Sequence, residues 1–355
     1  MNELMRAEIL DQPQALSQSL GRLRQELAAL SLSATSYRSI ILAGSGDSFI
    51  APLALSYAAR LCGMNNVHVL PALDASEYWP FAAEDLLVCI SVSGKAPQTI
   101  RAAQAARKQI ASILAITAAA DSPLAEISTD ILWLPFKSRS RQTPHTTDYL
   151  STLMALTTFI EHMTENKFNF LDVLAETVAE AISITESPCM KIGNSLKLSD
   201  KLIFLGGGPN YASGSYGAAK FWEAGGLIAA AFDIEEFAHG PHLIVDPGDP
   251  IFVIAPQGKS FNRAKEIISG LQELQGKVVV ITNASEELEG ADTLTIPDIS
   301  EEWSPFLTAI PLQWICLAVS NAKGYDVIAK DGRHANASQY EQAHRRWVSF
   351  PDGQT

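Results

Sequence analysis

The sequence predicts an α/β protein with two parallel-sheet domains, and two patterns support this. Short β-rich runs alternate with segments of helical apolar spacing, as in a parallel sheet whose strands are joined by helices. After a helical stretch near residues 149–199 the pattern starts again, so the second half repeats the first. The predicted strands are SIILAG, VHVLPA, DLLVCIS, SILAIT and DILWLP in the first half, and KLIFLG, IFVIAP, KVVVIT and DTLTIP in the second.

The two halves align by eye. Ser39 lies over Lys201 with an offset of 162, the SGK that ends at Lys95 lies over the QGK that ends at Lys259, and LAIT lies over VVIT. Two copies of one unit predict a crevice between them and ligand loops at the carboxyl ends of their strands. The predicted divisions are an N-terminal helical segment (1–29), a first domain (30–165), a helical connector (166–189), a second domain (190–345) and a tail (346–355).

Composition excludes several classes of protein. A chain of 355 residues with 47% hydrophobic residues can bury a large core, and its net charge of −13 argues against nucleic acid as a partner. The N-terminus has no apolar signal region and the apolar runs are interrupted, so we expect no membrane segment and a cytoplasmic location. The isolated cysteines fit buried thiols rather than disulfides or a zinc site; they are Cys62, Cys89, Cys189 and Cys316.

The stretch SVSGKAPQT, residues 91–99, has the chemistry of an anion site. Its hydroxyls belong to Ser91, Ser93 and Thr99, and Gly94 allows a tight turn at the start of a helix, where backbone N–H groups and the helix dipole favour a phosphate oxygen. An ordinary turn and helix cap would use the same residue types. Only this half keeps two hydroxyls at the turn, because the second half has Ala255 and Gln257 there.

The stretch GSGDS, residues 44–48, is a second Gly/Ser turn after the preceding strand. Ser45 and Ser48 are its hydroxyl residues, and two such loops at neighbouring strand ends converge on one place. A dinucleotide site is the rival interpretation. The third glycine of that fingerprint is absent, and no acid ends a second strand at the right distance.

A third group of residues suits proton transfer on a sugar. Lys220 and Glu223 are three apart on a predicted helix, so they share a face, and a Gly-Pro break after His239 places that imidazole near a chain turn. A solvated ion pair and a helix-ending histidine are the plainer interpretation. A metal site of His239, His242 and Glu235 is disfavoured because Pro241 interrupts a regular helical ligand face, so we expect no metal.

Together the Gly turns and the stretches SVSG, FLGGGPNYASGSYGAAKFWE, EEFAHGP and PLQWICLAVSNAKGYDV resemble the double sugar isomerase (SIS) domain family. The family includes the isomerase half of glucosamine-6-phosphate synthase, aminosugar-6-phosphate deaminases and fructosamine-phosphate deglycases. The resemblance implies two tandem SIS domains, each a flavodoxin-like three-layer sandwich. It also implies a catalytic Glu sixteen positions before a catalytic His, matched by Glu223 and His239, with Lys220 three before the Glu. By the same resemblance Ser91 and Ser93 hold the phosphate.

The chain departs from the family pattern in three places. Ala96 stands where the phosphate loop commonly has Thr or Ser, which removes one hydroxyl contact. A basic loop replaces an acidic neighbourhood, and its cations either are solvated or hold a second anionic group of the substrate; they are Lys137, Arg139 and Arg141. A Lys near the C-terminus that serves the synthase has no clear match, so a mechanism that relies on it is in doubt.

The residues and the resemblance predict an enzyme that acts on a sugar phosphate without a cofactor. In the expected reaction His239 assists ring opening and Glu223 moves a proton between C1 and C2, while Lys220 steadies an oxyanion or orients Glu223. Aldose–ketose isomerisation and deamination or deglycation of an aminated sugar phosphate both stay open. A noncatalytic sugar-phosphate sensor is disfavoured by the retained Glu and His. The resemblance implies a dimer or dimer of dimers, in which His239 serves the neighbouring subunit.

Overall fold

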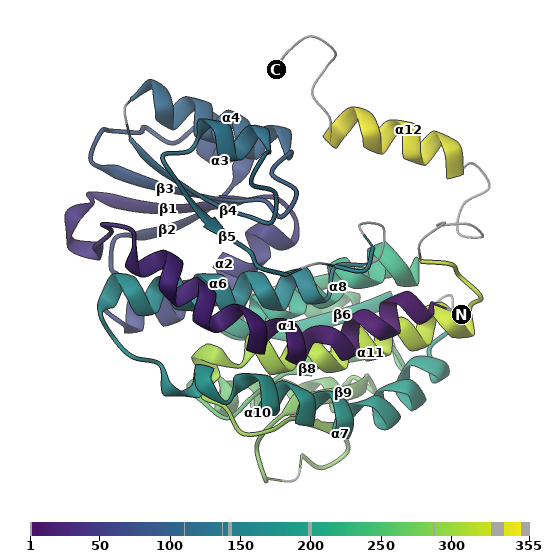
Figure 1. Ribbon diagram of the computed structural model, residues 1–355. Helices are drawn as coiled ribbons and strands as arrows, with labels where there is room; N and C mark the ends of the chain where they lie inside the picture. The colour runs from purple at the N-terminus through teal and green to yellow at the C-terminus, as the bar shows by residue number, and fades with distance from the viewer. Residues whose placement is uncertain are drawn as a thin grey trace. The chain divides into compact units, whose positions relative to one another are not determined.

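The computed structural model describes residues 2–109, 111–136, 138–140, 144–197, 201–286, 288–327 and 337–348. Its contacts divide the chain into two compact units. The first-half unit comprises Gln14–Ser138, Thr147–Leu174 and His334–Thr355. The second-half unit comprises Met1–Pro13, Arg139–Thr146 and Ala175–Arg333. Each unit contains one five-stranded parallel sheet (Figure 1). The sequence predicts both parallel sheets, with all five strands of the first and four of the second.

The sheet of the first-half unit has the strand order β2-β1-β3-β4-β5. Its strands are β1 (Ser39–Gly44), β2 (Val67–Pro71), β3 (Asp85–Ile90), β4 (Ser112–Thr117) and β5 (Asp130–Trp133). Strands β1 and β3 are buried along their whole length, which explains their continuous apolar sequences. In this order the chain reverses direction across the sheet between β1 and β3, which makes the gap between them the topological switch point.

Helices cover both faces of this sheet. Helices α3 and α4 lie together on one face, and α2 packs against α6 on the other (Figure 1). The helices of this unit are α2 (Asp47–Leu61), α3 (Ala72–Glu77), α4 (Pro97–Lys108), α5 (Pro123–Ile127), α6 (Thr147–Thr164) and α12 (Ala337–Val348), with the short turns η1 (Ala34–Ser36) and η2 (Asn169–Asp172).

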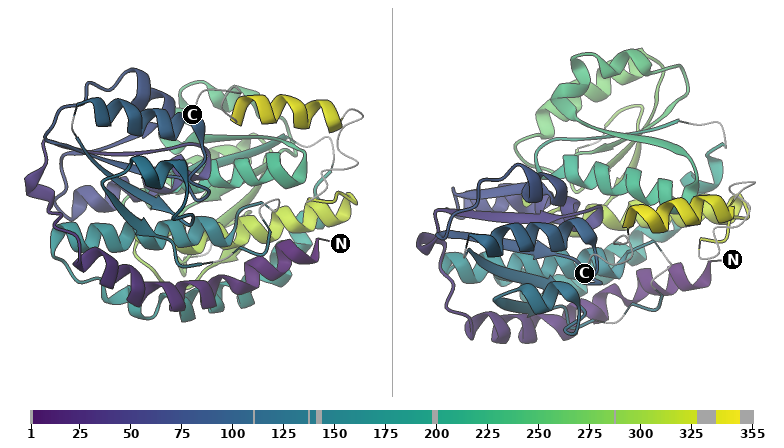
Figure 2. Two further views of the ribbon diagram at one scale, coloured as in Figure 1. Left: turned by 45° about the horizontal axis from the view of Figure 1, so that its top comes forward. Right: turned by 90° about the horizontal axis from the view of Figure 1, so that it is seen from above.

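The second-half unit repeats this architecture. Its sheet order, β7-β6-β8-β9-β10, is the same pattern in chain order, and all four pairs of neighbouring strands are parallel. The right-hand view of Figure 2 shows this unit, mostly in green, with helices beside its strands. The strands are β6 (Lys201–Gly206), β7 (Ile228–Asp233), β8 (Pro250–Ile254), β9 (Lys277–Thr282) and β10 (Asp292–Thr295). The helices are α7 (Leu174–Ser195), α8 (Pro209–Lys220), α9 (Ile234–Ala238), α10 (Phe261–Glu273) and α11 (Pro305–Ala322), with the turns η3 (Phe221–Gly225), η4 (Pro241–Ile244) and η5 (Glu301–Trp303).

Alternate residues of β6 show which helices cover which face of the second sheet. Ile203 and Leu205 belong to the core cluster that contains α9 and α10 residues. The ring of Phe204, one position away, lies 5.6 Å from that of Phe221, which follows α8, and α8 packs against α11. Because successive strand residues point to opposite faces, α9 and α10 cover one face while α8 and α11 cover the other.

Strand β7 is the one strand that the sequence analysis does not predict. Its sequence, IAAAFD, is rich in alanine, which is depleted in strands and gives no alternating pattern. The segment is held as a strand by pairing with β6 over Lys201 to Gly206. Its position is therefore set by tertiary pairing and not by local preference.

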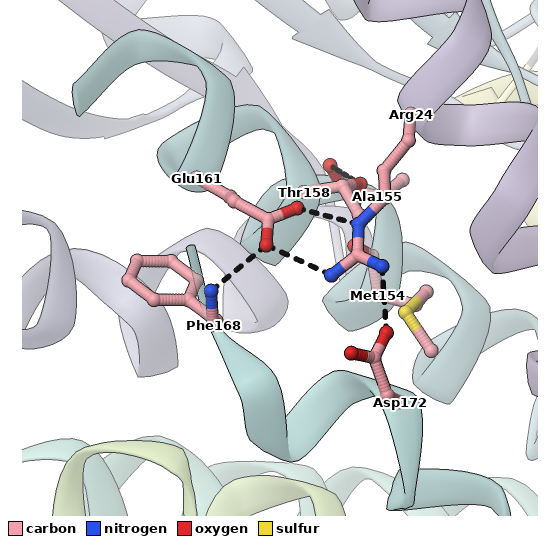
Figure 3. A network of polar contacts seen from close by, with 7 residues as sticks. All are labelled: Arg24, Met154, Ala155, Thr158, Glu161, Phe168 and Asp172. Atoms are coloured by element: carbon pink, nitrogen blue, oxygen red, sulfur yellow. Dashed lines mark hydrogen bonds and ion pairs between the residues drawn. The ribbon is translucent and has the colours of Figure 1, made fainter. Parts of the chain in front are cut away.

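Helix α1 (Glu3–Ala28) contributes residues to both units. Within the first-half unit, Arg24 joins α1 to α6 and η2 by hydrogen bonds (Figure 3). The guanidinium donates to both carboxylate oxygens of Glu161 on α6, at 2.8 Å each, and to Asp172 at 2.7 Å. The hydrogen bond from Arg24 is the largest cause that lowers the pKa of Asp172. This forked contact fixes the end of α1 on the unit that carries the predicted anion loops.

Helix α11 is long and apolar enough to cross a membrane by composition, but 89% of that span is buried within the protein. This is the pattern of a central core helix. Cys89, Cys189 and Cys316 are buried free thiols, as expected, while Cys62 at the end of α2 is partly exposed. Burial raises the pKa of the Cys89 and Cys189 thiols, which keeps them unreactive.

Candidate functional site

The two predicted anion loops lie side by side in the first-half unit. Residues 45–48 follow β1 and residues 91–96 follow β3, and these strands are direct neighbours in the sheet. Both loops therefore emerge at the carboxyl edge of the sheet, at its switch point, where parallel α/β sheets bind ligands. Each loop leads into a helix, so both helix N-termini point toward the same place.

The loop hydroxyls differ in their exposure. Ser45 and Ser93 are exposed, Ser48 is half-buried and Ser91 is buried, with 5% of its surface accessible. Thr99 lies in the first turn of α4 and is fully buried, and its hydroxyl has no hydrogen-bond partner among the described residues. The exposed and half-buried serines can reach a ligand directly, Ser91 only through the small part of its surface that is accessible, and Thr99 lies behind the loop.

Gly94 is required for the shape of the SVSGK turn. Its φ of +63° lies in the left-handed region, and a Cβ there would clash with the Ser122 hydroxyl. The Gly94 carbonyl accepts from the Leu124 N–H, and the Gly94 N–H donates to the Ser91 carbonyl. The turn therefore folds back on itself and packs tightly on the start of α5.

Lys220 and Glu223 form an ion pair at the end of α8. Lys220 Nζ lies 2.7 Å from Glu223 Oε2 and 5.1 Å from the centre of the Tyr216 ring. The Lys220 side chain is fully buried, whereas 41% of the Glu223 side chain is exposed. The simple solvated ion pair that the sequence leaves open is therefore wrong for the lysine. Its ammonium lies inside the fold, stabilised by a carboxylate and an aromatic face.

A π-helical turn, η3, carries Glu223. It extends α8 through Phe221–Gly225 and ends at Gly226, whose φ of +61° is left-handed. Single π turns within helices occur often at functional sites. Because α8 starts at the carboxyl end of β6 and η3 leads into the amino end of β7, Glu223 lies near the amino edge of its own sheet. It is therefore far from the Gly-rich turn that precedes α8.

His239 lies at the chain turn that the sequence predicts. It ends α9 and is followed by Gly240, whose φ is +143°. Its Nε2 lies 3.1 Å from Glu235 Oε1, and the other oxygen of that carboxylate accepts from Arg263 Nε at 2.6 Å. The hydrogen bond from Arg263, with a smaller one from His239, lowers the pKa of Glu235. The His239 imidazole is exposed to solvent, and its contact with Glu235 orients it.

The fold does not bring Glu223 and His239 together within one chain. Glu223 precedes β7 and His239 follows it, and a strand of six residues is roughly 20 Å long. The two residues also belong to opposite faces, because η3 packs on the Phe204 face and α9 packs on the Leu205 face. The sixteen-residue spacing thus reflects a helix end, a strand and a short helix rather than a local pair.

The basic loop has a partner within the chain. The Arg139 guanidinium donates to both carboxylate oxygens of Asp11 on α1, which raises the pKa of Arg139, and the Ser140 N–H donates to Glu8 at 3.1 Å. Arg139 therefore ties its loop to the N-terminal helix. Lys137 and Arg141 lie outside the described residues.

The Asp47 carboxylate acts electrostatically on the buried Tyr149 hydroxyl, and the sequence analysis does not predict this interaction. Asp47 is the first residue of α2, directly after the Gly-rich turn, and Tyr149 is buried in the first turns of α6. Burial, with a smaller contribution from the negative charge of Asp47, raises the pKa of the Tyr149 hydroxyl. The sequence feature that could have predicted it is the run of polar residues in TTDYLST, which lies at the start of a buried helix.

Within the residues that the structure describes, no group of three or more His, Cys, Asp or Glu side chains is placed to hold a metal ion. An open hollow of about 560 Å³ lies on the first-half unit, lined by Arg24, Glu161, His162 and Lys167 among others. Its lining includes the paired charges of Figure 3, and it lies at the end of α6 that is distant from the anion loops.

The SIS domain model matches residues 35–162 and 195–320, which is most of the chain. The chain belongs to the SIS domain family. Both matches fall on the two parallel sheets, one in each half. The predicted family and fold class are therefore confirmed.

Curated relatives of this SIS protein include glutamine–fructose-6-phosphate aminotransferases (isomerizing). The protein from Corynebacterium efficiens is 28% identical over 353 residues, covering 92% of this chain and 56% of that protein. The protein from Pyrobaculum aerophilum is 25% identical over 341 residues, covering 91% and 55%. The chain thus spans little more than half the length of these relatives.

Solved structures share its fold over nearly the whole chain. The C-terminal domain of the Francisella tularensis aminotransferase has a TM-score of 0.79 at 20% identity, covering 92% of this chain and 98% of that one. Escherichia coli tagatose-6-phosphate ketose/aldose isomerase has 0.78 at 19%, covering 94% and 95%. Thermotoga maritima glucosamine-6-phosphate deaminase has 0.73 at 19%, covering 93% and 98%.

Proposed function

We propose that this SIS protein is an enzyme that moves a proton between C1 and C2 of a phosphorylated sugar. The observation that carries the proposal is the Lys220–Glu223 pair. A fully buried ammonium holds the carboxylate at 2.7 Å while 41% of the Glu223 side chain stays exposed. A base that is fixed in direction yet open to a ligand meets the geometric requirement for general acid–base catalysis.

In the proposed reaction the anion loop binds the phosphate through Ser91, Ser93 and backbone N–H groups. His239 moves the proton between the ring oxygen and the C1 hydroxyl so that the sugar ring opens. Glu223 then takes the proton from C2 to give an enediol and returns it to C1, while a proton passes from the C2 hydroxyl to the C1 oxygen and leaves a ketone at C2. Lys220 orients Glu223, since its buried ammonium already donates to that carboxylate. Each such proton-transfer group contributes about 10² to 10⁴-fold in rate.

The separation of Glu223 and His239 implies that a site using both takes them from two copies of the chain. In a twofold dimer, each site then combines Glu223 of one copy with His239 of the other. This follows from the fold of a single second-half unit, where β7 and the sheet lie between the two residues. It agrees with the family resemblance, which also implies a dimer.

Mixing two inactive variants tests this arrangement. A panel of sugar phosphates, aminosugar phosphates and fructosamine phosphates, screened by thermal shift, first identifies a substrate. Glu223→Gln and His239→Ala are each expected to lose turnover alone, because every site then lacks one group. After co-refolding at equal amounts, about a quarter of the parent activity should return, since half the dimers are mixed and each has one complete site. No recovery in verified mixed dimers would contradict shared sites.

A deaminase or deglycase is the second candidate, because the same loop and acid–base residues serve an aminated sugar phosphate. The fold similarity to glucosamine-6-phosphate deaminase supports including it. Measuring released ammonia or amino acid beside ketose formation separates the two reactions. Tight binding of a panel member with no product of either kind would favour a noncatalytic sugar-phosphate sensor.

A further inference from the structure

Helix α11 carries a stripe of polar side chains although nearly the whole helix is buried. Gln313, Cys316 and Ser320 follow one another at spacings of three and four residues, so they share one face of the helix. All three are fully buried. A buried polar group costs free energy unless it is hydrogen-bonded, so the partners of this α11 stripe show what it holds in place.

Each member of the α11 stripe has a partner on the segment that carries Glu223. The contacts are Gln313 Nε2 to the Tyr216 hydroxyl at 3.0 Å, Cys316 Sγ to the Lys220 carbonyl at 3.1 Å, and Ser320 Oγ to the Ala224 carbonyl at 2.9 Å. Lys220 and Ala224 lie on either side of Glu223 in the chain. Helix α11 therefore holds the backbone of the π-helical turn both before and after this glutamate.

Tyr216 joins the α11 stripe to the Lys220 ammonium. Its hydroxyl accepts from Gln313 and donates to the His145 carbonyl at 3.1 Å, and the residue is fully buried. Lys220 Nζ lies 5.1 Å from the centre of the Tyr216 ring, and an ammonium is attracted most strongly to an aromatic face where both are desolvated. A ring that is held at its hydroxyl by two partners therefore gives the ammonium a fixed neighbour.

Helix α1 fixes the amide of Gln313. Gln12 and Gln313 exchange two hydrogen bonds, at 2.8 and 3.1 Å, and both side chains are fully buried. Gln12 Nε2 also donates to the Ile9 carbonyl at 2.9 Å. Pro13 has no N–H for the helical hydrogen bond to that carbonyl, so the Gln12 side chain supplies the missing donor. The break in α1 thus holds Gln12, which in turn holds Gln313, and all these residues belong to the second-half unit.

We propose that Tyr216 and Gln313 are positioning residues, which hold the Lys220 ammonium and through it the Glu223 carboxylate in one direction. The Lys220 side chain has no exposed surface, so its direction is set by the groups packed around it. Glu223 is 41% exposed, and its contact with Lys220 at 2.7 Å transmits that direction to it. The effect on turnover rests on the proposed function, whereas the holding of Lys220 by Tyr216 does not.

Steady-state kinetics with the substrate found by the panel is the first test. Tyr216→Leu should lower kcat about 10²-fold with KM unchanged, because a misdirected base loses its geometry while the binding groups stay in place. Tyr216→Phe keeps the ring and should lose about fivefold, the effect of one hydrogen bond, and so should Gln313→Leu. Phe252→Leu is the matched control and should keep the parent kcat. Phe252 is also fully buried, and its ring stacks on Phe204 at 5.0 Å, so this variant loses a comparable ring elsewhere on the sheet.

The reactivity of Lys220 gives a second readout that needs no substrate. Reductive methylation with formaldehyde and borohydride, followed by mass spectrometry of the peptides, measures how fast each lysine is modified. Lys220 should stay protected in the parent and in Phe252→Leu. In Tyr216→Leu it should react about tenfold faster or more, because the ammonium loses an aromatic neighbour in a desolvated place. Tyr216→Phe should restore the protection.

Parent-like kcat in folded Tyr216→Leu, in an enzyme that Glu223→Gln inactivates, would overturn the proposal. Unchanged protection of Lys220 in that variant, or an equal loss of kcat in Phe252→Leu, would overturn it too. If Tyr216→Leu does not fold, Tyr216→Phe and Gln313→Leu decide: a lowered kcat in both supports the proposal, and the parent rate in both overturns it. If Glu223→Gln keeps the parent rate, the proposed function fails, and the methylation of Lys220 alone then decides whether Tyr216 holds it.

Discussion

The two halves of the chain share a sheet topology but differ in the side chains of their equivalent loops and helix ends. At the switch point of the first sheet, the loop after β3 carries the exposed Ser93 and the buried Ser91 and packs on a neutral serine, Ser122. At the same point of the second sheet, the loop after β8 is bound to Glu301. The strands and turns place both loops equivalently, so the difference comes from a few side chains. The turn that binds an anion in the proposed function thus has a counterpart whose N–H groups donate to the chain's own carboxylate.

The C-terminal ends of α2 and α8, the helices that follow β1 and β6, also differ between the two halves. With the repeat offset of 162, Ala58 and Leu61 of α2 stand where Lys220 and Glu223 stand after α8. Leu61 is 59% exposed and uncharged. In the proposed function, the first half therefore supplies an anion loop without an acid–base pair, and the second half supplies the pair without an open loop. A duplicated unit can diverge in this way because each role needs only one copy.

The largest expected effect separates the two helix ends. Glu223→Gln should lower kcat by about 10² to 10⁴-fold with little change in substrate affinity, because the amide keeps its shape but cannot take a proton. Leu61→Gln, at the equivalent exposed position, is the matched control and should keep the parent rate. The measurement is steady-state turnover of the substrate found by the panel. Parent-like turnover by Glu223→Gln would remove it from the mechanism.

The next effect separates the two loops. Ser91→Ala with Ser93→Ala should weaken substrate binding about 100-fold or more, since hydrogen bonds to charged groups are worth about 1.5–3 kcal/mol each. Ser260→Ala changes the loop that Glu301 occupies and should leave the Kd of the substrate unchanged. Calorimetric titration of the substrate on both variants measures this. A similar loss of affinity in both would mean that the loops do not differ in function.

Ion pairs tie the amino edges of both sheets, and their burial differs. Arg38 donates to both oxygens of Asp85, whose side chain is fully buried, while Lys201 lies 3.1 Å from Asp249, whose side chain is 15% exposed. Asp85→Asn should lower the free energy of unfolding by about 1.5–3 kcal/mol, because charged hydrogen bonds are lost in a buried place. Asp249→Asn should cost less. Denaturant unfolding of both variants gives the comparison.

The Asp85 contribution also has a predictable pH dependence. Burial raises the pKa of this carboxyl, but hydrogen bonds from Arg38, the Ala82 N–H and Trp79 outweigh it, so the folded-state pKa is lowered. The stabilisation is therefore fully present above the unfolded pKa of about 4 and is lost as the pH falls through the lower folded value. The gap between parent and Asp85→Asn should be constant near neutral pH and shrink in acid. A gap that widens in acid would contradict the assignment.

The smallest expected effect is a gain. Ala96→Ser gives the open loop the hydroxyl that its counterpart has at Ser260, and it should tighten phosphate binding about tenfold. Ala29→Ser, at an exposed position of the same unit and outside both loops, serves as a control for a small-to-polar change. Equilibrium dialysis with inorganic phosphate measures both. Unchanged affinity in Ala96→Ser would show that position 96 does not face the anion.

Local sequence determined most of the architecture. Apolar β-rich runs such as SIILAG and KVVVIT are strands because parallel strands are buried on both faces, and their alternation with helices leaves few topologies. Gly and Ser directly after two of these strands predict two neighbouring loops at one edge of the sheet, which is where the structure has them. These features depend on residues close together in the chain, so a single sequence contains their signal.

Tertiary structure decided what depends on distant partners. The alanine-rich strand β7 exists because β6 pairs with it, and the burial of Lys220 follows from where α8 packs. Arg139 is held by Asp11, and Glu301 reaches the Ser260 loop from 41 positions away. The sequence named Glu223 and His239 as one pair, and the fold put them on opposite faces of a sheet. Burial, pairing and charge neutralisation are sums over contacts between remote segments, and periodicity and spacing in one chain do not encode those sums.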